Sequence, residues 1–327
     1  MIDVHGRRNP WGWLLIVLRW ATALLVLGVL LHFLPLGPLR AAIARVPISR
    51  LLAALLGYLL AHCVGVAKWR MVVNAAGAEL DLASSAQCYF GGLFGTLFLP
   101  SIVGGDVVRL AVGLQRSPRP AAVLAGNLVD RFLDVTAQAG LVLMGVLLAP
   151  NLDLTLHGFR GRLESGLLAV ACGLILLLIA VFKLRTRIFG GRSMRFRRRL
   201  ARLRHAVRAV STRPRVLIQG WLLGTCIQTG FLLLTAQLAV YCGLTLPLRA
   251  WLFAWPLAKL AAMLPLTQGG IGVREAVLVA LLVPLGGPAP LVLAAGLVWE
   301  GVVIAGGLVA GAVAFTIQKQ VGQVPAR

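Results

Sequence analysis

Residues 99–109 read LPSIVGGDVVR, and residues 264–274 read LPLTQGGIGVR. The proline and the arginine of the first copy both recur 165 residues later, from 100 to 265 and from 109 to 274. Each copy places a proline, two adjacent glycines and an arginine inside an otherwise apolar stretch. Interrupted apolar segments at corresponding places in two halves of a chain are typical of membrane transporters built from internal repeats. The sequence therefore predicts a fold made of two related halves.

The composition indicates a membrane protein. Of the 327 residues, 59% are hydrophobic and 13% are charged, and the mean hydropathy is +0.89. Soluble domains carry about 25% charged residues. Soluble enzymes and soluble binding modules are therefore excluded.

The formal net charge of +22 raises the alternative of a nucleic-acid-binding protein. Thirteen of the 32 lysines and arginines, however, lie between Lys183 and Arg215, in a linker between two apolar runs. No aromatic residues alternate with them, as base stacking would require. We expect a cytoplasmic basic loop at residues 184–215, in agreement with the positive-inside rule, and no nucleic-acid partner.

The apolar runs predict an all-α polytopic membrane protein. A spanning helix needs about 20 apolar residues, and two further apolar stretches are interrupted near their middles by the repeated motif. We interpret these two as re-entrant helical hairpins, since broken backbone at membrane depth is tolerated only inside protein or along a cavity. The six predicted transmembrane helices are 11–34, 50–73, 121–148, 164–183, 215–242 and 289–317, and the two hairpins are 84–116 and 249–284.

Counting outward from the cytoplasmic basic loop makes the two halves inverted copies. The chain is then one integral membrane domain, residues 1–327, with inverted-topology repeats at about 11–148 and 164–317 joined by a periplasmic segment. The first hairpin opens to the cytoplasm and the second to the exterior. Arg40, Arg45 and Arg50 disagree with this topology, because it places them outside.

The repeated motif supplies the first candidate site residues. The prolines end a half-helix, and the glycines permit positive φ and close approach. The half-helix that follows offers its positive dipole end to an anion, and an arginine binds phosphate through two donors at once. The alternative is that the glycines serve helix packing and the arginines extend to the interface. The predicted substrate-binding residues of the motifs are Pro100, Gly104, Gly105, Asp106, Arg109, Pro265, Gly269, Gly270, Arg274 and Glu275.

The helix predicted at 121–148 carries charges deep in its apolar run. Asn127, Arg131, Asp134 and Gln138 recur at steps of four, three and four, so they share one face, and Asp130 flanks them. Such groups usually face a partner or a watery cavity. Two interpretations stay open: substrate binding by Asp130, Arg131 and Asp134, or a structural Arg131–Asp134 pair.

Three other charged residues are expected partners for the arginines. They are Lys259, Glu275 and Glu300, and we include Glu300 in the predicted substrate-binding set. For Lys68 we favour extension toward a helix end or simple packing. The eight tryptophans lie mostly near predicted helix ends, which is typical of interfacial belts.

No enzyme motif or metal motif is found. The sequence contains no HExxH, GxSxG or GxxxxGK[ST] pattern, so zinc protease, serine hydrolase and NTP-driven pump are not supported. The five cysteines are scattered through apolar segments without CxxC spacing. We expect no cofactor, no metal and no enzymatic activity.

The blocks PSIVGGDVVR (residues 100–109), DRFLD (130–134) and GGIGVREA (269–276) carry a family resemblance. In this order, over nearly the whole chain, they resemble the lysylphosphatidylglycerol synthase transmembrane-region family, also called the flippase-like domain family. In bifunctional members, such a domain moves aminoacylated phosphatidylglycerol between leaflets, and a separate soluble domain makes that lipid. The sequence ends just after its last predicted helix, so we expect no synthase activity. Its LPLTQGG segment lacks a second proline that is common in the family.

The resemblance implies a lipid translocase of the bacterial inner membrane, with a phospholipid or a polyprenyl-phosphate lipid as substrate. Two alternatives remain open. One is a membrane-embedded enzyme acting on a lipid headgroup, with Asp106 and Asp134 as acid and base. The other is a secondary transporter of a small solute. The partners considered are membrane lipids and, in a homo-oligomer, further copies of the chain.

Overall fold

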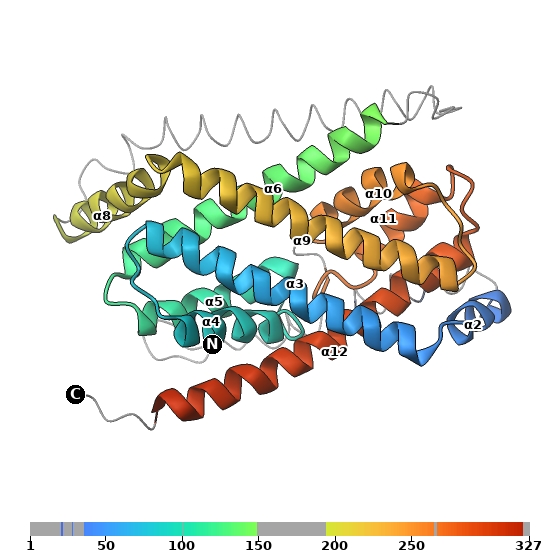
Figure 1. Cartoon of the computed structure of the whole chain (residues 1–327), viewed down its shortest axis with the longest axis horizontal. Helices are drawn as coiled ribbons and strands as arrows, with labels where there is room; N and C mark the ends of the chain where they lie inside the picture. The colour runs from blue at the N-terminus through green and yellow to red at the C-terminus, as the bar shows by residue number, and fades with distance from the viewer. Residues whose placement is uncertain are drawn as a thin grey trace.

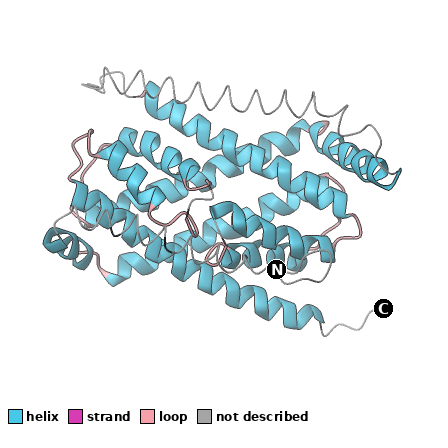
Figure 2. Ribbon diagram, turned by 180° about the vertical axis from the view of Figure 1, so that it is seen from behind, coloured by secondary structure: helices cyan, strands magenta, loops and turns pink. Residues whose placement is uncertain are grey.

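The structure is a computed structural model of the chain and describes residues 36–99, 101–148, 194–264 and 267–322, with residues 21 and 28. These residues form ten α-helices and no β-strand (Figures 1 and 2). Pro100, Pro265 and the predicted helices 11–34 and 164–183, apart from residues 21 and 28, lie outside the described residues. The helices are α2 (Leu36–Ala44), α3 (Ile48–Ala75), α4 (Leu82–Gly95), α5 (Ser101–Arg116), α6 (Pro120–Leu147), α8 (Met194–Ser211), α9 (Pro214–Tyr241), α10 (Leu248–Ala261), α11 (Val273–Leu282) and α12 (Ala289–Gly322).

Four long helices occupy the positions expected of spanning segments. They are α3, α6, α9 and α12, of 28, 28, 28 and 34 residues. Both α6 and α9 begin at a proline, whose fixed φ suits the first turn and whose missing N–H needs no partner there. Of the helices that the structure describes, α3, α9 and α12 are long and apolar enough to cross a membrane. The polar face of α6 lies in the site described below.

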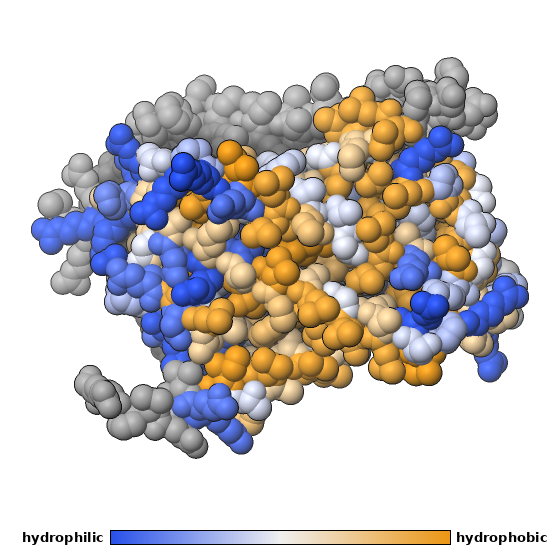
Figure 3. Space-filling view, viewed as in Figure 1, coloured by the Kyte–Doolittle hydropathy of each residue, from blue (hydrophilic) through white to orange (hydrophobic). Residues whose placement is uncertain are grey.

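The outer surface agrees with a lipid environment. On α3, Leu52, Leu56 and Leu60 recur every four residues and are each more than half exposed, so they form an apolar stripe along the helix. Apolar residues cover the middle of the face in Figure 3, and hydrophilic residues gather mainly toward the end that carries α8. The chain is therefore a helical, multi-pass membrane protein.

The two interrupted apolar stretches become helix–break–helix units. In the first, α4 and α5 are separated by the segment around Pro100, and in the second, α10 and α11 are separated by residues 262–272. The second break requires glycine at three positions, because Gly269, Gly270 and Gly272 have φ values of +60°, +81° and +83°. We call these units hairpin one (α4–α5) and hairpin two (α10–α11).

Each hairpin packs on a long helix from the other half of the chain. Hairpin one packs through α4 on α12, and hairpin two packs through α10 on α6. The central helices α3 and α9 lie against each other and run in opposite directions, and α6 and α12 also run in opposite directions (Figure 1). The chain therefore interlocks its halves, and each hairpin is held by the last long helix of the other half.

The basic segment expected as a loop at residues 184–215 contains a helix, α8, which packs on α6. Leu203, Ala206, Val207 and Val210 recur at helical spacing on the side that joins the core, and Ala206 and Val210 are buried. The arginines between them mask this 3.6-residue period. A loop in the sense of irregular structure was therefore wrong for residues 194–211, whereas the cytoplasmic location of this connection stays a prediction.

The expectation of interfacial tryptophans was also wrong for half of them. The side chains of Trp69, Trp251, Trp255 and Trp299 are no more than 2% exposed. They pack in the core between helices, with Trp251 and Trp255 on α10, Trp69 on α3 and Trp299 on α12. Position along the sequence therefore does not distinguish these tryptophans from interfacial ones.

Candidate functional site

The tips of the two hairpins meet in the middle of the molecule. The Gly269 N–H donates to the Leu99 carbonyl over an N···O distance of 3.4 Å. Within hairpin one the two arms touch through backbone, since a Cβ on Gly105 would lie 2.4 Å from the Gly92 carbonyl oxygen. The paired glycines of the motif therefore allow close approach inside the hairpin, and the breaks of both motifs come together.

Six charged side chains from α3, from α5 of hairpin one and from α6 form a closed ring of alternating sign. Each member lies within 4.0 Å of both its neighbours. The Asp130–Lys68 and Lys68–Asp134 distances are 2.9 and 2.5 Å. In order, the ring runs Lys68, Asp130, Arg109, Asp106, Arg131, Asp134 and back to Lys68.

The helical spacing of the sequence builds much of this charge ring. Asp106 and Arg109 are three residues apart on α5, and Arg131 and Asp134 are three apart on α6, so each pair lies on one face. Lys68 joins them because α3 packs against α6. Four of the six, including Lys68 and Asp130, are 6% exposed or less as whole residues. Three cations and three carboxylates cancel, as the low-dielectric interior demands.

Arg109 is further held by aromatic rings. Its guanidinium carbon lies 4.0 Å from the centre of the Tyr89 ring and 5.8 Å from that of Trp69. Trp69 in turn donates from Nε1 to Asn127 Oδ1 at 3.0 Å. Asn127, which shares the polar face of α6, therefore fixes the aromatic ring beneath Arg109 and does not line the cavity.

The charge ring borders a cavity of about 90 Å³ between α3, the hairpins, α6 and α9. A water molecule needs about 10–15 Å³ on this measure, so the cavity has room for several waters or a small charged group. Within the described part of the chain, buried polar atoms at Asp106 Oδ2, Arg109 Nε and Arg131 Nε have no hydrogen-bond partner. Buried polar atoms without protein partners usually bind water or a ligand. The other polar lining residues include His62, Gln138, Gln228 and Lys259.

Lys259 of hairpin two enters this cavity from the other half of the chain. Its Nζ donates to Gln228 Oε1 at 2.7 Å and lies 4.7 Å from the centre of the Phe231 ring. Among the described residues, no carboxylate lies within 4.0 Å of it. With three carboxylates and four cations lining it, the cavity has a formal excess of one positive charge.

The second arginine of the repeated motif lies in a separate cluster. Arg274 pairs with Glu275 at 2.8 Å and with Glu300 of α12, and all three are buried. Glu275 also accepts from the Gly272 N–H at 2.7 Å, which caps α11. Two carboxylates therefore neutralise Arg274, and none of the three residues lines the cavity of the charge ring.

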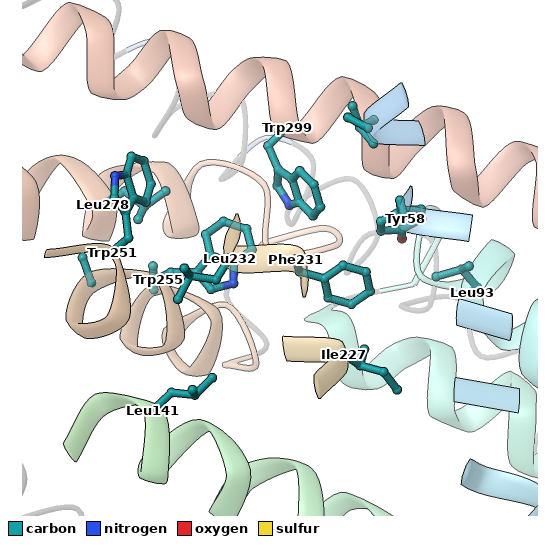
Figure 4. Close-up of a cluster of buried hydrophobic side chains, with 14 of the residues drawn as sticks. Tyr58, Leu93, Leu141, Ile227, Phe231, Leu232, Trp251, Trp255, Leu278 and Trp299 are labelled. Atoms are coloured by element: carbon teal, nitrogen blue, oxygen red, sulfur yellow. The ribbon is translucent and has the colours of Figure 1, made fainter. Parts of the chain in front are cut away.

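Aromatic side chains that pack together contact residues of both sites, and Figure 4 shows them among other buried apolar side chains. Trp299 packs against Tyr58, Phe231 and Trp255, with ring centres 5.4–5.9 Å apart. Lys259 lies over Phe231, and Arg274 lies 5.9 Å from the Trp255 ring centre.

The structure thus brings together only part of the predicted site. The cavity lining includes Gly105, Asp106, Arg109, Asp130, Arg131 and Asp134. Gly104 lies in the first turn of α5, and Gly269 and Gly270 lie in the break of hairpin two. Arg274, Glu275 and Glu300 form the second cluster. The expected partnership of Glu275 and Glu300 with an arginine is present, and so is the structural Arg131–Asp134 pair, at 3.8 Å.

Sequence reasoning missed Lys68. Its side chain is 3% exposed and bonds two aspartates, so of the two expectations, extension to a helix end was wrong, and the residue is packed inside the bundle. Lys259 was expected to be a partner of an arginine, and it instead bonds Gln228. His62 and Tyr89, which are hydrogen-bonded to each other at 3.3 Å, were also missed. A signal existed for Lys68 alone: the segments 106–109 and 130–134 together hold three carboxylates and only two arginines.

Comparison with known proteins adds a family. No curated protein and no solved structure matches the chain. A family model, the lysylphosphatidylglycerol synthase TM region, matches residues 15–311, which include every helix of the two hairpins and both charged clusters. The chain therefore belongs to the family of the lysylphosphatidylglycerol synthase transmembrane region.

Proposed function

We propose that the protein is a lipid translocase that moves a phospholipid or a polyprenyl-phosphate lipid between the leaflets of the bacterial inner membrane. The observation that carries the proposal is the buried cavity with one cation more than its carboxylates, enclosed by membrane-spanning helices. The family name supports it, since it refers to the membrane part of a protein whose product is a lipid. The acid–base enzyme is less well supported, because Asp106 and Asp134, the two aspartates that would act as acid and base, are both ion-paired.

The physical need for such a cavity comes from the headgroup. A charge at the bilayer centre costs from about 2.5 to over 10 kcal/mol, depending on the method. Cations and hydrogen-bond donors that replace the hydration of a phosphate lower this cost. Lys259 supplies the uncompensated charge, and the partnerless N–H groups of Arg109 and Arg131 supply donors. Because the cations of the charge ring are already paired with carboxylates, a bound phosphate would be held mainly by one excess cation and could leave again.

Three observations support an inverted-topology repeat with re-entrant hairpins. Helices α3 and α9 have 28 residues each, and α4 and α10 have 14 each. The packing of each hairpin on the other half's last helix is what a two-fold axis between the halves would produce. In each half, an arginine of the second hairpin arm also pairs with a carboxylate of the long helix that follows, Arg109 with Asp130 and Arg274 with Glu300.

Reconstituted transport tests the function. Proteoliposomes containing the protein should move a labelled phospholipid or polyprenyl phosphate between leaflets faster than protein-free liposomes do, because the cavity lowers the cost of headgroup transfer. Leaflet-specific quenching of the label measures the rate. No transfer across a broad lipid panel, with folded protein and an imposed ion gradient, would exclude the translocase and favour the small-solute transporter.

Cysteine labelling tests the inverted topology. In a background without native cysteines, Gln115→Cys at the open end of hairpin one should react with an impermeant thiol reagent only from the cytoplasm. Pro288→Cys, just after hairpin two, should react only from the exterior. Both positions are exposed, so accessibility does not limit labelling. Reaction of both from the same side would contradict the inverted repeat.

A further inference from the structure

A second cavity lies at the end of the molecule that carries α8, away from the charge ring. Its volume is about 630 Å³, and it is bordered by α8, the end of α3 and the start of α6. Its basic lining residues are Arg119, Arg202, His205 and Arg213, and none of its lining residues is a carboxylate. We propose that this cavity binds the headgroup of an anionic phospholipid from the surrounding leaflet.

The shape of the cavity follows from small side chains. On α8, Ala201, Ala206 and Ala209 lie on the wall beside Arg202 and His205. The spacing of these residues places them along one side of the helix. The short alanine side chains leave the cavity open between α8 and α6, where longer side chains would fill it. The basic residues line the same cavity.

The charge of the cavity suits a phosphate. Arg202 and Arg213 are both exposed, and neither lies within 4.0 Å of a carboxylate among the described residues. Arg119 has a surface partner, Glu79, at 2.8 Å. The first turn of α6, at Pro120, adds the positive end of its helix dipole. Basic cavities between helices of membrane proteins bind anionic headgroups.

The depth of the cavity favours a lipid over a soluble anion. The span of α3 ends at Ala75, which lines the cavity, and the span of α9 begins at Pro214, next to the lining residue Arg213. The cavity therefore lies where hydrocarbon gives way to headgroups. A lipid phosphate is at this level without leaving its leaflet, whereas a free anion must come from bulk water.

Native mass spectrometry of the purified protein tests the assignment. The wild type, in neutral detergent with phosphatidylglycerol or phosphatidylcholine, should retain phosphatidylglycerol preferentially. The triple variant Arg119→Gln, Arg202→Gln, Arg213→Gln should retain at least about tenfold less phosphatidylglycerol, since each arginine near a membrane surface contributes about fivefold to binding. The matched control Arg198→Gln, Arg208→Gln, Arg215→Gln removes three exposed arginines outside the cavity lining and should retain the lipid.

All variants are made in a Lys259→Gln background, which removes the excess charge of the transport cavity. Binding at the α8 end is thereby separated from substrate binding, and failure of one proposal leaves the other intact. Equal loss in both triple variants would mean general electrostatic attraction and would overturn the site. Protection of the protein against thermal unfolding by inorganic phosphate alone, equal to that by phosphatidylglycerol, would overturn the lipid assignment.

Discussion

Lys259→Gln is expected to slow lipid transfer by about 10- to 100-fold, which corresponds to losing one charged hydrogen bond to a phosphate. Lys259 carries the cation that no carboxylate within 4.0 Å balances among the described residues. Its removal leaves the charge ring intact, so the melting temperature should stay unchanged or rise, since an unbalanced buried charge costs free energy. Transfer in proteoliposomes and thermal unfolding in detergent are measured side by side.

Two variants control this experiment. Lys259→Arg keeps the charge and should retain much of the transfer rate. Lys319→Gln removes a lysine that is exposed near the end of α12 and should transfer lipid at the wild-type rate. If Lys259→Gln transferred lipid as fast as the wild type, the cavity's excess charge would have no part in substrate binding.

Arg274→Ala is expected to destabilise the protein, although its motif position matches that of Arg109. The change leaves Glu275 and Glu300 buried without the cation that joins them. Removing one partner of a buried pair costs about 3–5 kcal/mol, a large share of the roughly 5–15 kcal/mol that is typical of folded domains. Thermal unfolding of the purified protein measures the loss.

A second substitution should restore part of this stability. Glu300→Gln in the Arg274→Ala background removes one of the two stranded charges, while Glu275 keeps the Gly272 N–H. Arg249→Ala, on the exposed side of hairpin two, is the matched control and should unfold like the wild type. A stable Arg274→Ala protein that transfers no lipid would place Arg274 on the substrate path instead.

The sequence predicted the long helices from the length of their apolar runs. It predicted both breaks because the repeated motif acts locally. Proline, paired glycines and the arginine act within one or two turns, so their effect can be read without knowing the fold. The same holds for Asp106 and Arg109 or Arg131 and Asp134, whose pairing depends only on helical spacing.

The rest of the site depends on how helices cross, which one sequence does not contain. Lys68 looks like an ordinary lysine near the end of an apolar helix, and only its contact with α6 makes it part of the ring. Arg109 and Arg274 look equivalent, yet one lines a cavity and the other lies between two glutamates. Charge balance within each cluster, rather than motif position, distinguishes the two.

The contact between the Gly269 N–H and the Leu99 carbonyl has a mechanical consequence. Because the hairpins enter the bundle from opposite ends (Figure 1), in the proposed inverted topology only these two loops would separate the two sides of the membrane along this line. In that topology, withdrawal of either loop would open a path from its own side, while the opposite hairpin would keep the other side closed. Two loops on separately anchored hairpins would thus be enough to expose the site to one side of the membrane at a time.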